Sequence, residues 1–188
     1  MVAAKPSIDG AQPNWAVVEL RVDRLTDLFD PFDPFPTPSR DLSRSAEDFI
    51  VGWAREAHER APLSIVAYVA AGEAQAGDAS ALAQAVKSHF TARATRVSGD
   101  LHELFRVGRV SLVIGLGVLA LCSASGSLIE AGMGERPLAR FLSEGLIILG
   151  WVANWRPLEI FLYDWWPLLA RRKLFRRLAE ATVTVRAA

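Results

Sequence analysis

The sequence predicts an α+β membrane protein in which a two-helix transmembrane hairpin is attached to a small cytosolic α/β domain. Three observations predict this fold class. Two apolar stretches, residues 110–129 and 142–163, are each long enough to cross a hydrocarbon core of roughly 30 Å. Short segments of strand-like pattern lie near both ends of the chain. The outer sides of the apolar stretches carry an excess of basic residues, whereas the connection between them has little positive excess.

The charge distribution predicts an orientation. The chain has 188 residues, a formal net charge of zero and a mean hydropathy of +0.20. Residues before Leu104 are net acidic and the rest are net basic. Because cytoplasmic flanks of spans carry the excess of lysine and arginine, both termini are expected in the cytoplasm of a multi-pass inner-membrane protein. The beginning of the chain lacks the pattern of a signal peptide, so the first span itself is expected to direct insertion.

The organisation that follows has six parts. They are a flexible arm (1–14), a cytosolic α/β domain (15–108), transmembrane helix 1 (109–129), an external loop (130–141), transmembrane helix 2 (142–166), and a basic helix with a C-terminal strand that completes the cytosolic domain (167–188).

Elements of the first domain follow from periodicity. Residues 15–23 alternate apolar and polar side chains, and residues 63–70 are β-branched and aromatic, so both are predicted strands. Between them, residues 25–38 are rich in proline and predict an extended loop. We expect Phe29, Phe32 and Phe35 of this loop to pack against the domain.

A first helix is predicted to begin near Ser45, which forms a capping-box pattern with Asp48. Pro62 is expected to end it. The apolar face of this helix is predicted to hold Phe49, Ile50, Trp53 and Ala57, and the polar face Glu47, Arg55, Glu56 and Glu59.

A second helix is predicted to start at Asp78 and to run without a break into the first span. Apolar residues recur at helical spacing from Leu82 to Leu104, and no proline interrupts them. The alternative is two helices broken at Ser98-Gly99. Within the span, the pairs Ser111/Gly115 and Ala120/Ala124 have the small-xxx-small spacing that permits close helix approach.

The second span carries an unusual polar cluster: Asn154, Arg156, Pro157 and Glu159. Arg156 and Glu159 are three residues apart, close enough to pair on one helix. Pro157 lacks an N–H and leaves the carbonyl of Ala153 without its helical donor. Charged groups inside a membrane usually face protein or water, so this cluster is a candidate ion path or partner site. The alternative is a self-neutralised structural lock with Arg156 extended towards lipid phosphates.

Interfacial anchors are predicted after this cluster. They are Asp164, Trp165, Trp166, Arg171, Arg172 and Lys173, and membrane lipid is their expected partner. Asp164 is expected to orient the Trp165 indole or to pair with Arg171 or Arg172. Pro167 is predicted to precede a basic helix, 168–179, and residues 182–186 to form a strand. A single strand is unstable in water, so this strand is expected to join the sheet of the first two.

Catalytic, cofactor and metal sites are not predicted. Neither a phosphate-binding glycine loop nor a nucleophile elbow nor a zinc motif occurs. His58, His89 and His102 lack metal-ligand spacing, and His89 and His102 are expected on a helix surface. Cys122 lies within a span and is expected to be a packing residue. The basic cluster is too close to the membrane to indicate nucleic acid.

The second half resembles a family of short bacterial membrane proteins with two spans and no assigned activity. The resemblance rests on residues 150–152 (GWV), 155–159 (WRPLE) and 163–167 (YDWWP). It extends to residues 18–38 and to the helix at 48–55, and it implies a bacterial inner-membrane setting.

Three functions fit these features. The first is a membrane-anchored interaction or accessory subunit, and not an enzyme, that docks a partner membrane protein or its own copies through the polar cluster. The second is a small homo-oligomeric channel or transporter component in which Asn154, Arg156 and Glu159 ring a pore. The third is a membrane-tethered enzyme, for which the sequence offers the least support.

Overall fold

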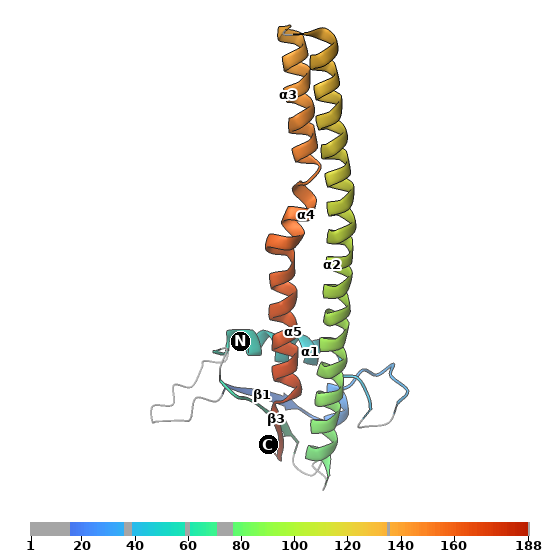
Figure 1. The fold of residues 1–188 in the computed structure, drawn as a ribbon. Coiled ribbons are helices and arrows are strands. Elements are labelled where there is room, and N and C mark those ends of the chain that lie inside the picture. Colours follow the sequence, from blue (N-terminus) through green and yellow to red (C-terminus); the bar gives the residue numbers. More distant parts are fainter. Residues whose placement is uncertain (1–15, 36–38, 59–60, 71–76, 135, 188) are drawn as a thin grey trace. The chain divides into compact units, whose positions relative to one another are not determined.

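A computed structural model describes residues 16–35, 39–58, 61–70, 77–134 and 136–187 of this chain (Figure 1). The protein is mostly helical and contains a small parallel sheet of three strands. The predicted arm, residues 1–14, lies outside the described residues. The strands are β1 (Ala16–Val22), β2 (Leu63–Val69) and β3 (Thr182–Ala187). The helical elements are η1 (Leu25–Leu28), α1 (Arg44–Glu56), α2 (Asp78–Met133), α3 (Pro137–Val152), α4 (Trp155–Glu159), η2 (Ile160–Asp164) and α5 (Trp165–Ala179).

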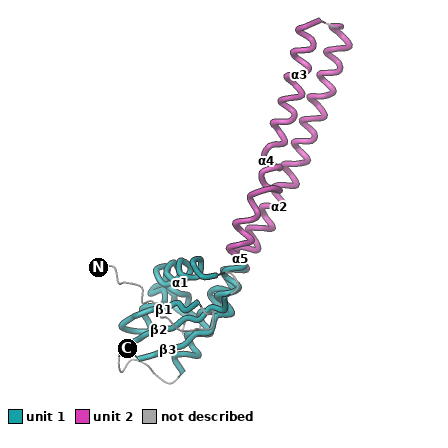
Figure 2. The backbone as a smooth tube through the Cα atoms, turned by 90° about the vertical axis from the view of Figure 1, so that its left-hand side faces the viewer, with its two compact units in different colours: residues 1–94, 173–188 teal, residues 95–172 magenta. Residues whose placement is uncertain are grey.

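The chain forms two compact units (Figure 2). The first consists of Met1–Ala94 and Lys173–Ala188, and the second of Thr95–Arg172. Helix α2 begins in the first unit and continues in the second. The first unit therefore draws residues from both ends of the chain, and the second is a helical hairpin.

The three strands are parallel and lie in the order β1-β2-β3. Val18 pairs with Ile65, and Ile65 with Val183. The expectation that the last strand joins the sheet of the first two is thus confirmed. Parallel neighbours need a crossover connection, and here α1 links β1 to β2 while the whole hairpin links β2 to β3.

One face of the sheet forms the core of the first unit, and α1 lies on one side of the strands (Figure 2). Val18, Leu20, Ile65 and Ala67 alternate inward and are 7 % exposed or less. The opposite face is more polar. It carries the aligned row Arg21, Tyr68 and Arg186, together with Glu19 and Thr184. The core is completed by helix residues, which include Ile50, Leu82, Phe90, Phe175 and Leu178, with the rings of Phe90 and Phe175 stacked at 6.0 Å.

The prediction of which face of α1 points to the core is wrong by part of a helical turn. Ser43, and not Ser45, is its N-cap, and the Ser43 hydroxyl accepts a hydrogen bond from the Ala46 N–H at 3.3 Å. Ile50 and Ala54 are buried as expected, but Phe49 and Trp53 are 44 % and 47 % exposed. Glu47, which was assigned to the polar face, is buried, because it has partners on α2 that the sequence of α1 does not contain. The helix ends at Glu56, ahead of Pro62.

The loop after β1 also differs from its prediction. Phe29 is buried, but Phe32 and Phe35 are 91 % and 63 % exposed. The reason is local hydrogen bonding. The Phe32 N–H donates to Asp30 Oδ1 at 2.9 Å and the Phe35 N–H to Asp33 Oδ1 at 3.0 Å, so each aspartate closes a tight turn that directs the following phenylalanine outward.

Helix α2 is continuous over 56 residues, so the alternative of a break at Ser98-Gly99 is wrong. Its prediction as one helix with the first apolar stretch is confirmed. The connection to α3 is shorter than the expected loop of residues 130–141, because α2 continues to Met133 and α3 begins at Pro137. Gly134, at φ +67°, ends α2 in the left-handed conformation that glycine adopts without strain, and Pro137 starts the next helix.

The residues from Pro137 to Ala179 are helical almost throughout, and Pro167 lies inside α5 and not before it. Pro167 has no N–H, so a carbonyl one turn earlier lacks its helical donor, and the π-helical turn η2 lies directly before this part of α5. By length and composition, two helices could cross a membrane: Asp78–Met133 and Pro137–Ala179. Only 17 % and 22 % of their most apolar windows are buried.

Candidate functional site

The candidate site lies where the second helix of the hairpin changes its winding. Helix α3 ends at Val152, and a turn at Ala153 and Asn154 leads into α4. Pro157 has no N–H to donate to the Ala153 carbonyl, which explains the interruption of the regular ladder. A π-helical turn, η2, follows at Ile160–Asp164. Such widened turns appear mostly as short insertions within α-helices, frequently at functional sites.

The Asn154 side chain connects this break to helix α2 by a hydrogen bond. Its side chain is buried, and its Nδ2 group donates to the Gly150 carbonyl at 2.9 Å and to the Gly115 carbonyl at 3.1 Å. Its Oδ1 atom is buried and has no hydrogen-bond partner within the described part of the chain. A Cβ atom on Gly115 would lie 2.7 Å from Oδ1 and 3.0 Å from the Ala153 carbonyl oxygen. Only glycine allows α2 to approach the break this closely.

Other small residues repeat this close approach along the hairpin. A Cβ on Gly108 would lie 2.8 Å from the Ile160 side chain, and a Cβ on Gly150 would lie 2.7 Å from Leu119. Of the predicted small-residue pairs, Ser111/Gly115 therefore contributes Gly115 to packing within the hairpin. Ala120 and Ala124, by contrast, are exposed.

Arg156 forms two ion pairs on the outside of the hairpin. Its Nη1 atom lies 3.2 Å from Glu159 Oε2 and 3.1 Å from Asp164 Oδ2. Glu159 also accepts a hydrogen bond from the Trp155 indole N–H at 2.9 Å. The side chains of Arg156, Glu159 and Asp164 are 60 %, 42 % and 34 % exposed. One guanidinium thus faces two carboxylates, and we call these three residues the Arg156 triad.

The structure divides the predicted polar cluster in two. Asn154 and Pro157 are buried within the hairpin, whereas Arg156 and Glu159 are exposed and gain Asp164 as a third member. The expectation that Asp164 orients the Trp165 indole is wrong, because that indole donates to the Phe161 carbonyl at 3.0 Å. Asp164 is eight residues from Arg156, beyond the usual helical pairing distance. The π-helical turn between them was not foreseeable from spacing rules.

The hairpin register shows how deep the triad lies in the apolar stretch. Gly115 contacts Asn154, and Gly108 contacts Ile160. Arg156 is therefore level with a position between these two glycines, about one turn from Arg109 at the start of the apolar residues of α2. That is close to one end of the stretch and roughly 10 Å from its middle at about 1.5 Å per residue.

The predicted anchors lie on α5, except for Asp164, which is the last residue of η2. Trp165 and Trp166 are in edge contact, with ring centroids 5.6 Å apart, and Trp166 is 64 % exposed. Arg171 and Lys173 are exposed and Arg172 is half-buried. Farther along, Arg177 donates to the carbonyls of His58 and Ala61 at 3.0 and 2.9 Å, so it holds the segment before β2.

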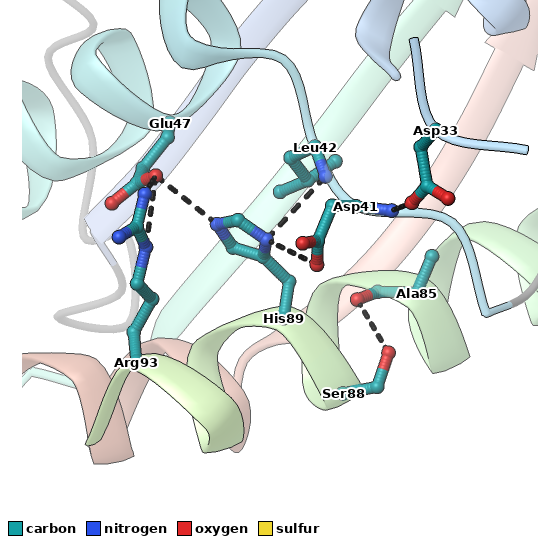
Figure 3. Close-up of polar contacts among 8 residues, drawn as sticks. All are labelled: Asp33, Asp41, Leu42, Glu47, Ala85, Ser88, His89 and Arg93. Atoms are coloured by element: carbon teal, nitrogen blue, oxygen red, sulfur yellow. Dashed lines mark hydrogen bonds and ion pairs between the residues drawn. The ribbon is translucent and has the colours of Figure 1, made fainter. Parts of the chain in front are cut away.

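A second polar cluster, which the sequence analysis missed, lies in the first unit (Figure 3). His89 on α2 is 4 % exposed and is not a surface residue. Its Nε2 atom is 3.2 Å from Glu47 Oε2, and its Nδ1 atom is 3.1 Å from Asp41 Oδ1. Arg93, one turn further along α2, also pairs with Glu47. The i, i+4 spacing of His89 and Arg93 was visible in the sequence, but their partner on another helix was not.

The protonation of His89 decides which bonds it makes. The neutral ring accepts the Leu42 N–H at Nδ1, 3.4 Å away, and directs an Nε2 proton to Glu47. The imidazolium form donates to Asp41 and Glu47 together. In either form the cluster joins the segment before α1 to α2. Among the described residues, no group of three or more His, Cys, Asp or Glu side chains is arranged to hold a metal ion.

Comparisons of this chain with protein-family models, with curated proteins and with solved structures find no match. The resemblance to short bacterial two-span proteins therefore stays a prediction.

Proposed function

We propose that this protein is a membrane-anchored interaction subunit that crosses the inner membrane twice, with both termini in the cytoplasm. The observation that carries the proposal is the outward apolar surface of the hairpin. Large hydrophobic side chains between Val107 and Trp166 are exposed by 41 to 73 %. Each buried Val, Leu, Ile or Phe side chain contributes roughly 1.5–3 kcal/mol when removed from water, so a surface of this kind favours a hydrocarbon environment.

The Arg156 triad is the proposed docking site within this surface. Two carboxylates share one guanidinium, which leaves the group with a formal charge of −1 near the end of the apolar stretch. A partner helix that presents a lysine or arginine at this level would neutralise the excess carboxylate. The rings of Trp155, Tyr163 and Trp166 are exposed and close in sequence to the triad, and they would supply apolar contact to a partner helix.

A homo-oligomeric channel is a second candidate, because the triad faces outward and several copies would bring it together in a ring. Asn154 does not belong to such a ring, since its amide is engaged with the carbonyls of Gly115 and Gly150. The channel hypothesis therefore rests on Arg156, Glu159 and Asp164. Purified chain in liposomes should then conduct ions, and Glu159→Gln should alter the selectivity. A complete lack of flux excludes this candidate.

The first test of docking is the mass and composition of the complex that contains the chain. A tagged full-length chain would be extracted from native membranes with mild detergent, and the Arg156→Gln and Glu159→Gln variants would be treated in parallel. Arg140→Gln and Glu144→Gln are matched controls, because Arg140 and Glu144 form an exposed ion pair on the same hairpin at 3.0 Å. We expect the triad variants to lose a stoichiometric membrane partner and the control variants to retain it.

Three outcomes are informative. Loss of the partner in the triad variants alone supports docking through the triad. Equal retention in all four variants excludes it. A chain that is extracted without detergent, in the soluble fraction, overturns the membrane proposal itself.

A further inference from the structure

Strand β1 has a backbone edge that faces away from β2. Within the described part of the chain, β1 is the first strand of the sheet and pairs with β2 alone. The Ala16 N–H donates to the Pro62 carbonyl at 3.1 Å, so the backbone groups of Ala16 point towards β2. Backbone groups of successive residues in a strand point to opposite sides. Those of Val17, Glu19 and Arg21 therefore point away from β2, towards the open edge.

The charges of Glu19 and Arg21 on this edge are complementary to those of a second, antiparallel copy of β1. Suppose that a second β1 pairs antiparallel with the first, with Leu20 of both copies on the two-fold axis. Glu19 then lies opposite Arg21 of the second copy, and Arg21 opposite its Glu19. Registers centred on Glu19 or on Arg21 instead place like charges directly opposite each other. Opposite charges across a strand pair are stabilising and like charges are destabilising, so the two side chains favour one register.

The adjoining side of α1 is apolar and open. Phe49 and Trp53 are 44 % and 47 % exposed, and their ring centroids are 6.2 Å apart. Two hollows lie beside them along β1. One, of about 240 Å³, is lined by Leu20, Arg21, Val22 and Phe49 among others, and the second, of about 250 Å³, by Ala16, Val17, Val18 and Trp53 among others. Nothing lies within 4 Å of a Cβ built on Gly52, between the two rings in sequence, so another helix has room to approach there.

We propose that two copies of this chain associate through this surface, which consists of the open edge of β1 and the Phe49–Trp53 side of α1. The two sheets become one continuous sheet, joined by backbone hydrogen bonds at Val17, Glu19 and Arg21. Because α1 covers the same face of the sheet in both copies, the two α1 helices meet and cover each other's aromatic rings. Pairing also removes an open strand edge that would otherwise be available to unrelated chains. The inference goes beyond the proposed function, because it does not involve the Arg156 triad.

Charge reversal provides the decisive experiment. Full-length chain in detergent micelles would be diluted in steps, and its mass followed by sedimentation. We expect E19R alone and R21E alone each to weaken the dimer roughly tenfold or more, because each places like charges opposite one another twice. The double variant E19R/R21E should regain the original affinity. A mixture of the two single variants should form heterodimers, because one then carries only arginines and the other only glutamates at the edge.

The mixture also separates misfolding from lost association, since a variant that failed to fold would not be rescued by a second one. R186E is the matched control. Arg186 lies on β3 in the same row of the sheet as Arg21, but at the opposite edge, so its reversal should leave the dimer unchanged.

Cross-linking in native membranes provides the second readout. E19C/R21C in a C122S background should join two chains with a short thiol reagent, whereas T182C/R186C on β3 should not. Equal cross-linking at both edges, or none at either, overturns the proposal, as does a monomeric wild-type chain. A dimer that persists in every β1 variant overturns the proposal and places the association on the hairpin. If the triad variants lose their membrane partner but keep this dimer, the docking site and the dimer surface are separate and the inference stands.

Discussion

The Asn154 amide donates a hydrogen bond to the carbonyl of Gly115 at 3.1 Å, across 39 residues of chain. The bond links the break in the second hairpin helix to the part of α2 that belongs to the hairpin. Gly115 has the two properties that this contact needs, an accepting carbonyl and no side chain to hold Asn154 away. The polar interruption at Ala153–Asn154 is therefore part of the packing between the two helices.

Gly115→Val is expected to destabilise the hairpin. A Cβ at this position would lie 2.7 Å from Asn154 Oδ1, and overpacking of a tight contact costs roughly 1–3 kcal/mol. Thermal unfolding of the purified chain in detergent measures the loss. Gly117→Val is the control, because nothing lies within 4 Å of a Cβ there. Equal melting temperatures for the two variants would show that α2 does not approach the break as described.

Asn154→Leu should cost about 1 kcal/mol, since hydrogen bonds between membrane helices contribute roughly 0.6 kcal/mol on average and up to about 1.7. Asn154→Asp should cost more. It replaces the donating amide with a carboxylate that faces the carbonyl oxygens of Gly115 and Gly150. Chemical unfolding in mixed micelles gives the ranking. Ser127→Ala serves as control, because the Ser127 hydroxyl bonds only to its own helix, at the Ser123 carbonyl. A larger loss for leucine than for aspartate contradicts this assignment.

Glu47→Ala is expected to destabilise the first unit by roughly 1–3 kcal/mol, because it leaves the buried Nε2 group of His89 without its partner and removes the ion pair with Arg93. Chemical unfolding of the full chain, followed by circular dichroism, measures the change in the free energy of unfolding. Glu56→Ala removes an exposed carboxylate from the same helix and should have little effect. If both variants unfold alike, Glu47 does not hold α1 to α2.

The loop after β1 should respond to acid through Asp33. Hydrogen bonds from the backbone N–H groups of Asp41 and Phe35 lower the pKa of this carboxyl below its usual value of 3.8. A group with a lowered folded-state pKa stabilises the structure fully above the unfolded-state pKa, and the stabilisation is lost as the pH falls through the folded-state pKa. The amide signals of Asp41 and Phe35 should therefore remain native at pH 5 and shift below about pH 4.

Asp33→Asn should abolish this acid-dependent shift, and Asp48→Asn, an exposed carboxyl of α1, should leave it intact. Nuclear magnetic resonance of the full chain in micelles resolves the two cases. A shift that persists in Asp33→Asn would assign the response to another group.

Strand positions and the long α2 were predictable because they depend on local periodicity, and the joining of β3 to the sheet was predictable because a lone strand needs a partner. Alternation identifies a strand within seven residues, and a lone strand requires a partner. The orientation of α1 was harder to predict. Its sequence shows an apolar stripe, but Glu47 is buried because His89 and Arg93 arrive from a helix more than forty residues later in the chain. A pairing between distant elements leaves no trace in either element alone.

In the candidate site, too, contacts within one helix turn were predictable and contacts that depend on tertiary structure were not. Spacing predicted the Arg156–Glu159 pair, since residues three apart share a helix face. Spacing did not predict the inward turn of Asn154 or the approach of Asp164 to Arg156. Both occur where the helix is interrupted at Ala153 and widened at η2, and the inward turn of Asn154 also needs the close approach of Gly115 from another helix.

The two neighbours of the central strand β2 are synthesised at very different times. β1 leaves the ribosome just before it, but β3 follows only after the entire hairpin has been made. Loop-closure entropy must be overcome before so distant a pairing stabilises the sheet. Until then one side of β2 is an unsatisfied template for foreign strands. The sheet can therefore be completed only after both hairpin helices have been synthesised, and a chain that ends within the hairpin leaves one side of β2 unpaired.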